Sequence, residues 1–183
     1  KIIFLDVDGV LNSDQYFVRL RDEKIRVGAR TWTAAERARR GYEAHIDPAA
    51  LSLLDGVRRR TGADVVLSSS WRAVWSIDEM SEMLGFRLID FTQPPSDGVT
   101  RGQEIDAWLR DQADRPSVAV LDDWDAMELS PWSHRLVRTD PAVGLTEERA
   151  DLASRLLDAG PGAYTDGVSV LSCVSSALSE PGG

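Results

Sequence analysis

The chain has 183 residues, of which 43% are hydrophobic and 28% charged. This balance is typical of a soluble globular protein with a buried core, and the length allows one domain with a small insertion. No apolar run approaches the roughly 20 residues that cross a bilayer, and the lone Cys173 excludes an internal disulfide framework. These features predict a cytoplasmic protein without a membrane partner.

The net charge of −9 is unevenly distributed along the chain. The first 72 residues carry 13 Lys or Arg and 10 Asp or Glu, whereas the remaining residues carry 8 and 20. The basic stretch has four interleaved aromatic residues: Tyr16, Phe17, Trp32 and Tyr42. Two interpretations stay open. The stretch forms either an ordinary solvated surface whose aromatics pack inward, or a patch that grips and stacks on a nucleic acid strand.

In the first third of the chain, the apolar run at residues 2–5 predicts a buried strand that ends in a turn at Asp6-Val7-Asp8-Gly9. A mixed polar insertion follows at about residues 13–47, with a helical pattern around 33–41. The pair Asp47-Pro48 then predicts a helix start, because Asp caps the first turn and Pro fits the first helical position. Gly62 is expected to end that helix.

The rest of the chain repeats the alternation of strand and helix. Strands are expected at 65–67, 86–89, 118–121 and 136–137, and helices at 77–84, 101–112 and 146–157. Short apolar strands that alternate with helices favour a parallel sheet covered on both faces. We therefore expect an α/β domain over residues 1–159. Residues 160–183 are rich in Gly, Ser and Pro and are expected to form a tail, with a candidate edge strand at 168–171.

Three of the expected strands end in polar side chains, and in a parallel sheet these ends share one edge. The first is followed by Asp6 and Asp8, the second by residues 68–70, all serines, and the third by Asp122 and Asp123. Four carboxylates at one edge repel one another unless a cation lies among them. Mg²⁺ suits such oxygen ligands and also offsets charge on phosphoryl oxygens, so the pattern predicts a phosphoryl-transfer site.

Four segments, in this order, resemble the motifs of haloacid dehalogenase-like (HAD) phosphatases. They are residues 3–12 (Ile-Phe-Leu-Asp-Val-Asp-Gly-Val-Leu-Asn), 65–69 (Val-Val-Leu-Ser-Ser), 101–105 (Arg-Gly-Gln-Glu-Ile) and 118–123 (Val-Ala-Val-Leu-Asp-Asp). The resemblance implies a three-layer, Rossmann-like HAD fold with a central, mainly parallel sheet and only small cap insertions. It also implies a Mg²⁺-dependent phosphatase.

Carried over residue by residue, the resemblance assigns catalytic roles to four side chains. Asp6 is expected to be the nucleophile that forms an aspartyl-phosphate, and Asp8 the proton donor and acceptor. Arg101 and Ser69 are expected to hold the phosphoryl group.

The remaining assignments concern phosphate and metal. Ser68 stays open as the alternative phosphate ligand. Gly9 is expected to let the backbone turn so that amide groups approach the phosphate. The expected Mg²⁺ ligands are Asp6, the backbone carbonyl of Asp8, Asp122 and Asp123. Which of Asp122 and Asp123 binds the ion directly, and which through water, stays open.

Overall the chain is similar to the HAD domains of Swiss Army Knife RNA repair proteins. Besides the four motifs, the similarity includes residues 68–72 (Ser-Ser-Ser-Trp-Arg), Trp108-Leu109, Asp140-Pro141 and 144–146 (Gly-Leu-Thr). It implies a polynucleotide end, such as an RNA or DNA 3′-phosphate, as substrate and further repair domains in a longer parent protein as partners. A small sugar or nucleotide phosphate is the alternative substrate. A catalytically inactive module that binds phosphate or nucleic acid is the alternative of another class.

Overall fold

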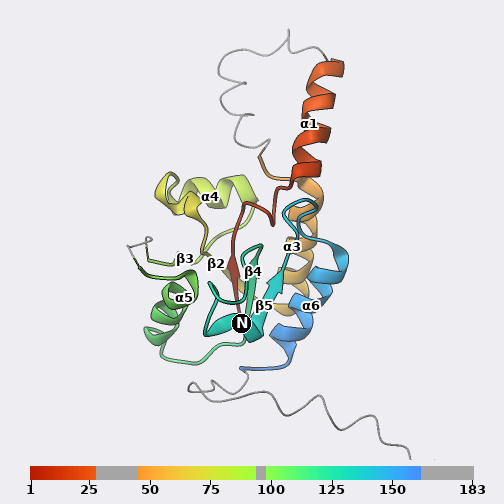
Figure 1. Ribbon diagram of the computed structural model, residues 1–183. Helices are drawn as coiled ribbons and strands as arrows, with labels where there is room; N and C mark the ends of the chain where they lie inside the picture. Colours follow the sequence, from red (N-terminus) through yellow and green to blue (C-terminus); the bar gives the residue numbers. More distant parts are fainter. Residues whose placement is uncertain (28–44, 94–97, 162–183) are drawn as a thin grey trace, which may run out of the picture.

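The computed structural model describes residues 1–27, 45–93 and 98–161, which contain a five-stranded parallel sheet (Figure 1). The strand order is β3-β2-β1-β4-β5. The strands are β1 (Ile2–Leu5), β2 (Asp64–Leu67), β3 (Asp90–Phe91), β4 (Val118–Asp122) and β5 (Leu136–Arg138). The order reverses at β1, which pairs with both β2 and β4. Ligands of open parallel sheets bind at the carboxyl edge beside such a reversal.

Helices cover both faces of the sheet (Figure 1). The covering helices are α3 (Pro48–Thr61), α4 (Ile77–Leu84), α5 (Arg101–Arg110) and α6 (Glu147–Asp158), with short 3-10 helices η1 (Ser70–Ala73) and η2 (Trp132–Arg135). Helix α1 (Asp14–Val27) projects away from the sheet beyond the carboxyl ends of the strands (Figure 1). Alternate side chains of β1 point to opposite cores. Ile3 and Leu5 pack in a core with residues of α3, α4 and α6, whereas Phe4 packs in a second core with residues of α5. The predicted three-layer α/β fold is therefore confirmed.

Local signals fix the ends of several helices, and those expected for α3 are confirmed. Asp47 caps α3, its carboxylate accepting from the Ala49 amide at 2.9 Å, and Gly62 ends the helix with a left-handed φ of 69°. Thr100 caps α5, where its side chain and that of Gln103 bond to each other's backbone amides. This cap fixes the start of α5, so Arg101, its first residue, has a defined position at the carboxyl edge.

Two sequence-based expectations differ from the structure. The strand expected at 86–89 is wrong: the ladder with β2 lies at Asp90–Phe91, because the Leu88 amide donates to the Ser81 hydroxyl of α4 and the Leu88 side chain is buried in the core. The insertion begins with helix α1, which the mixed polar pattern did not indicate. Its first turn is capped by Ser13, whose hydroxyl accepts from the Tyr16 amide.

Several expectations lie outside the described residues. They are the helix at 33–41, the aromatic residues Trp32 and Tyr42, and the tail from residue 162 with its edge strand. Along the described ranges, no helix combines the length and apolar character required to cross a membrane.

Gly102 allows the start of α5 to pack tightly on the loop before η2. Its amide donates to the Glu128 carbonyl at 2.9 Å, and an added Cβ would collide with the carbonyl of Ser130 and with backbone atoms of Leu129. Gly56, in α3, offers a matched control because a Cβ there would meet nothing within 4 Å.

We expect Gly102→Ala to lower the free energy of unfolding by about 1–3 kcal/mol, because the backbone must move apart. Gly56→Ala should raise it by up to about 1 kcal/mol, since Ala favours a helix over Gly. Urea denaturation followed by circular dichroism measures both. Equal effects of the two substitutions would contradict the tight contact.

Candidate active site

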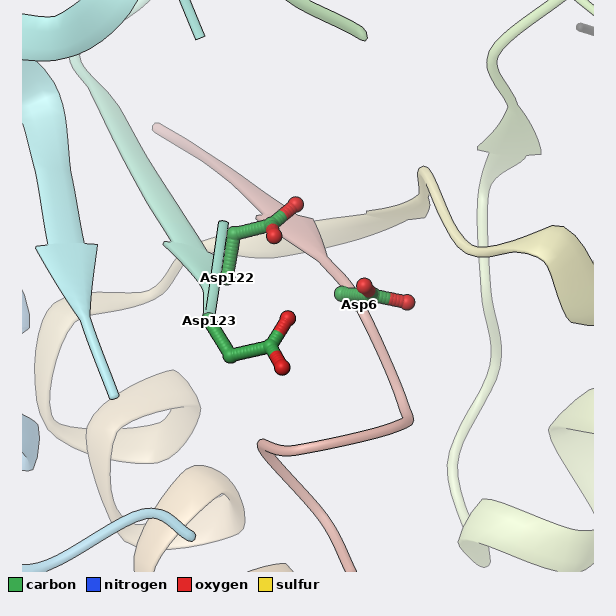
Figure 2. Close-up of side chains that lie close together, drawn as sticks. All are labelled: Asp6, Asp122 and Asp123. Atoms are coloured by element: carbon green, nitrogen blue, oxygen red, sulfur yellow. The ribbon is translucent and has the colours of Figure 1, made fainter. Parts of the chain in front are cut away.

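Three carboxylates meet where β1 and β4 end side by side (Figure 2). One oxygen from each of Asp6, Asp122 and Asp123 lies within 4.8 Å of the others. The Asp6 amide donates to the Leu121 carbonyl at 2.9 Å, which continues the β1–β4 ladder up to the site. Asp6 and Asp122 are buried, and Asp123 is half-buried. Adjacent strands thus bring together acidic residues more than 110 positions apart in the sequence.

Arg101 provides the positive charge among these carboxylates. Its Nη1 lies 2.7 Å from Asp6 Oδ2 and 3.0 Å from Asp122 Oδ2, and its side chain is only 8% exposed. Burial alone would lower the pKa of Arg101, but Asp6 and Asp122 outweigh burial and raise it. The guanidinium therefore stays charged and fixed in place.

One arginine does not neutralise three carboxylates. Burial, followed by repulsion from Asp6, raises the pKa of Asp122 to about 6 and also raises that of Asp123. A hard cation fits this donor set, because carboxylate oxygens are the ligands that Mg²⁺ prefers and the local charge favours a positive partner. These three side chains could therefore hold a metal ion.

Asp8 is held from two sides by hydrogen-bond donors. Asn12 Nδ2 donates to Oδ1 at 2.8 Å, and the indole Nε1 of Trp71 donates to Oδ2 at 2.9 Å. Both carboxylate oxygens are thereby oriented, although Asp8 itself is exposed. Trp71 is also half-buried and packs against the core, so it both orients Asp8 and contributes to packing.

Gly9 makes room for a metal-site carboxylate. It adopts a left-handed φ of 70°, and a Cβ there would lie 2.5 Å from Asp123 Oδ2. Its amide donates to Asn12 Oδ1 at 2.9 Å, so the expected contact between this amide and phosphate would require that bond to open. Its carbonyl accepts from the Thr139 hydroxyl at 2.8 Å, which fixes the loop after β1.

The serines after β2 differ in what their hydroxyls do. Ser68 and Ser69 are fully buried. Ser69 Oγ accepts from the Trp71 amide at 3.4 Å and caps η1, whereas Ser68 Oγ has no hydrogen-bond partner among the described residues. Ser70 is exposed and lines the cavity at the site. The choice between Ser68 and Ser69 as phosphate ligand remains a prediction, with Ser68 carrying the uncommitted hydroxyl.

Arg72 joins the end of β2 to α5 through a buried ion pair. Its Nη2 lies 2.5 Å from Glu104 Oε2, and both side chains are less than 5% exposed. Nη1 donates to the Ser69 carbonyl at 2.8 Å. Burial lowers the pKa of Arg72 and raises that of Glu104, and their mutual attraction opposes both shifts. Arg72 thus pairs with Glu104 and also borders the cavity.

A cavity of about 270 Å³ opens at this edge. It is lined by Asp6, Asp8, Ser70, Arg72, Val99, Arg101, Glu104, Asp123 and Trp124. The structure thus brings Asp6, Asp8, Arg101 and Asp123 to one cavity. Asp122 does not line this cavity, but its Oδ2 lies 3.0 Å from Arg101 Nη1. The sequence reasoning gave no role to Asn12, Glu104 or Trp124, although Trp124 directly follows the acidic pair.

The comparisons with known proteins agree with this geometry. The model for the family described as "HAD domain in Swiss Army Knife RNA repair proteins" matches residues 2–150, which include every residue of the cavity. No curated protein and no solved structure matches the chain. On the strength of the family match, the chain belongs to the HAD domains of Swiss Army Knife RNA repair proteins.

Proposed function

We propose that this protein is a Mg²⁺-dependent phosphomonoesterase that acts through an aspartyl-phosphate on Asp6, with a polynucleotide end as substrate. The observation that carries the proposal is the cluster of Asp6, Asp122 and Asp123, two of which pair with Arg101, beside a cavity that Asp6, Asp8, Arg101 and Asp123 line. Family membership supports the chemistry, and its association with RNA repair supports the substrate class.

The first step is attack by an Asp6 carboxylate oxygen on phosphorus. As the new oxygen–phosphorus bond forms, the bond to the leaving oxygen breaks, and the Asp8 carboxylic acid gives that oxygen a proton. Asp8 then accepts a proton from water, which attacks phosphorus and breaks the bond to Asp6. Inorganic phosphate leaves, and Asp6 is restored. Arg101 donates hydrogen bonds to phosphoryl oxygens and keeps Asp6 in place.

Asp6, Asp122 and Asp123 would hold Mg²⁺, with the Asp8 carbonyl as a further ligand. When bound, the ion neutralises charge that develops on the phosphoryl oxygens. The Ser68 or Ser69 hydroxyl would contact the phosphoryl group, because both follow β2 beside the Asp6 end of β1.

We expect phosphate release from a 3′-phosphorylated RNA or DNA oligonucleotide in the presence of Mg²⁺. A 5′-phosphorylated strand and sugar phosphates complete the panel. Asp6→Asn should lower kcat by roughly three orders of magnitude or more, because an amide is a poor nucleophile toward phosphorus.

Asp125→Asn is the matched control, since Asp125 lies in the same loop as Asp123 and its Oδ1 only accepts from backbone amides, which Asn also permits. Release from sugar phosphates alone would replace the polynucleotide with a small metabolite. A steep fall of oligonucleotide affinity with added salt would support a nucleic acid substrate. Full activity of Asp6→Asn would contradict the assignment of Asp6 as the nucleophile. No phosphate release by the unmodified protein with Mg²⁺ present would favour an inactive binding module.

The metal proposal predicts that Mg²⁺ raises the Tm at pH 8, because an ion that binds only the folded state stabilises it. Since the pKa of Asp122 is raised to about 6, this carboxyl is ionised at pH 8 and largely protonated at pH 5. Mg²⁺ must displace that proton at the lower pH, so the increase in Tm should shrink as the pH falls through 6.

Asp123→Asn should reduce the increase in Tm at pH 8, and Asp125→Asn should leave it intact. Thermal denaturation with and without Mg²⁺ measures the effect. An increase that is the same at both pH values, or unchanged in Asp123→Asn, would contradict a metal site at these carboxylates.

The bond from Trp71 to Asp8 predicts a role in positioning the proton donor. Trp71→Phe removes the indole donor and keeps an aromatic ring, so kcat for an alkyl phosphate should fall about tenfold with KM little changed. An aryl phosphate such as p-nitrophenyl phosphate has a good leaving group that needs no proton, so its kcat should fall less.

Trp75→Phe provides the control, since Trp75 is a half-buried tryptophan of the same segment that packs against the core. Equal losses for the alkyl and aryl phosphates would indicate a general disturbance of the site and would contradict the positioning role.

A further inference from the structure

Trp124 is the one exposed tryptophan among the five that the structure describes, and it lies at the catalytic cavity. Its side chain lines the cavity and the residue is 45% exposed, whereas Trp71 and Trp75 are half-buried and Trp108 and Trp132 are buried. Trp combines a large apolar ring with a polar N–H and is enriched at interfaces, so an exposed Trp at the edge of a cavity is suited to contact a ligand.

The ring of Trp124 is held in a fixed place. The Arg101 guanidinium lies over one face, with Cζ 4.7 Å from the ring centroid. Arg101 is itself fixed by its ion pairs with Asp6 and Asp122. The Trp124 amide donates to Asp122 Oδ1 at 2.9 Å, which fixes the backbone. Because the Trp124 side chain is already ordered, stacking of a ligand on it costs the protein little side-chain entropy.

The cavity has room for only part of a substrate. Its volume of about 270 Å³ lies below the roughly 300–1,000 Å³ of sites that enclose a drug-sized ligand. The phosphoryl group occupies the end with Asp6 and Arg101, so the group that bears the phosphate must extend across the rim. Of the nine lining residues, Val99 and Trp124 are the apolar ones, and both are exposed.

We propose that Trp124 is a stacking platform for the nucleobase of the terminal phosphorylated nucleotide, with Val99 as an additional apolar contact. This inference deepens the proposed function and rests on it. A flat, aromatic group attached near the phosphate matches an exposed ring beside the phosphoryl-binding arginine. Stacking tolerates any base, because every base presents a π-face, so the platform selects nucleotides over sugar phosphates without selecting a sequence.

The experiment compares two oligonucleotides that differ at the phosphorylated terminus, one with its base and one abasic. The end used is the one that the unmodified protein dephosphorylates. We expect kcat/KM of the unmodified protein to be higher for the base-bearing substrate. In Trp124→Ala, the ratio of the two kcat/KM values should fall roughly five- to a hundredfold, mostly through KM, as expected for the loss of one base–aromatic stack.

Trp124→Phe keeps an aromatic ring beside Arg101. It should therefore retain most of the preference, in kcat/KM, for the base-bearing over the abasic substrate. Met127→Ala is the control, because Met127 is an 80% exposed apolar residue of the same loop that does not line the cavity. Met127→Ala should leave kcat/KM unchanged for both the base-bearing and the abasic substrate.

Each other outcome overturns the inference in a distinct way. Equal losses for both substrates in Trp124→Ala would mean that the ring acts only by steadying Arg101. The phosphatase function would then stand and the platform would be wrong. A ratio near one in the unmodified protein would also refute the platform alone. Absence of turnover with either substrate would overturn the proposed function and the platform together.

Discussion

The ion pairs of Arg101 with Asp6 and Asp122 are the interaction on which the rest of the site depends. Two buried carboxylates at the junction of β1 and β4 would each cost several kcal/mol without a partner. Arg101 supplies that partner from the first turn of α5, at 2.7 and 3.0 Å. The position of α5 is fixed in turn by the Thr100 cap and by Gly102, which packs on the backbone of the loop before η2.

Arg101 alone does not balance the negative charge of the three carboxylates. Asp122 and Asp123 have raised pKa values because burial and Asp6 both disfavour their ionised forms. This arrangement favours joint binding of a divalent cation and an anionic substrate. Each of the two reduces the electrostatic repulsion that opposes binding of the other. A fully neutralised cluster would be more stable and would have less affinity for metal. The acidic excess is therefore a physical requirement of the proposed chemistry.

A second layer of contacts orients the groups that would react. Asn12 and Trp71 hold the Asp8 carboxylate. Asn12 also accepts from the Gly9 amide, so this asparagine bonds to both Asp8 and Gly9 of the loop after β1. The ion pair of Arg72 with Glu104 links η1 to α5. The walls of the cavity thus come from segments that follow different strands but are fixed to one another by polar bonds.

The sequence alone determined the α/β class, the five-strand alternation, most helix ends and the acidic cluster, because these depend on local patterns. Buried strands of four residues, the cap at Asp47 and the aspartates at strand ends are each recognisable from neighbouring residues alone. Only the tertiary structure decided that the ladder of β3 is at Asp90–Phe91, since the Leu88 amide bonds to Ser81 of α4. Likewise, the bond from Trp71 to Asp8 and the stack of Arg101 on Trp124 join residues from separate segments. No local pattern specifies such contacts, because they depend on how strands and loops meet at the sheet edge.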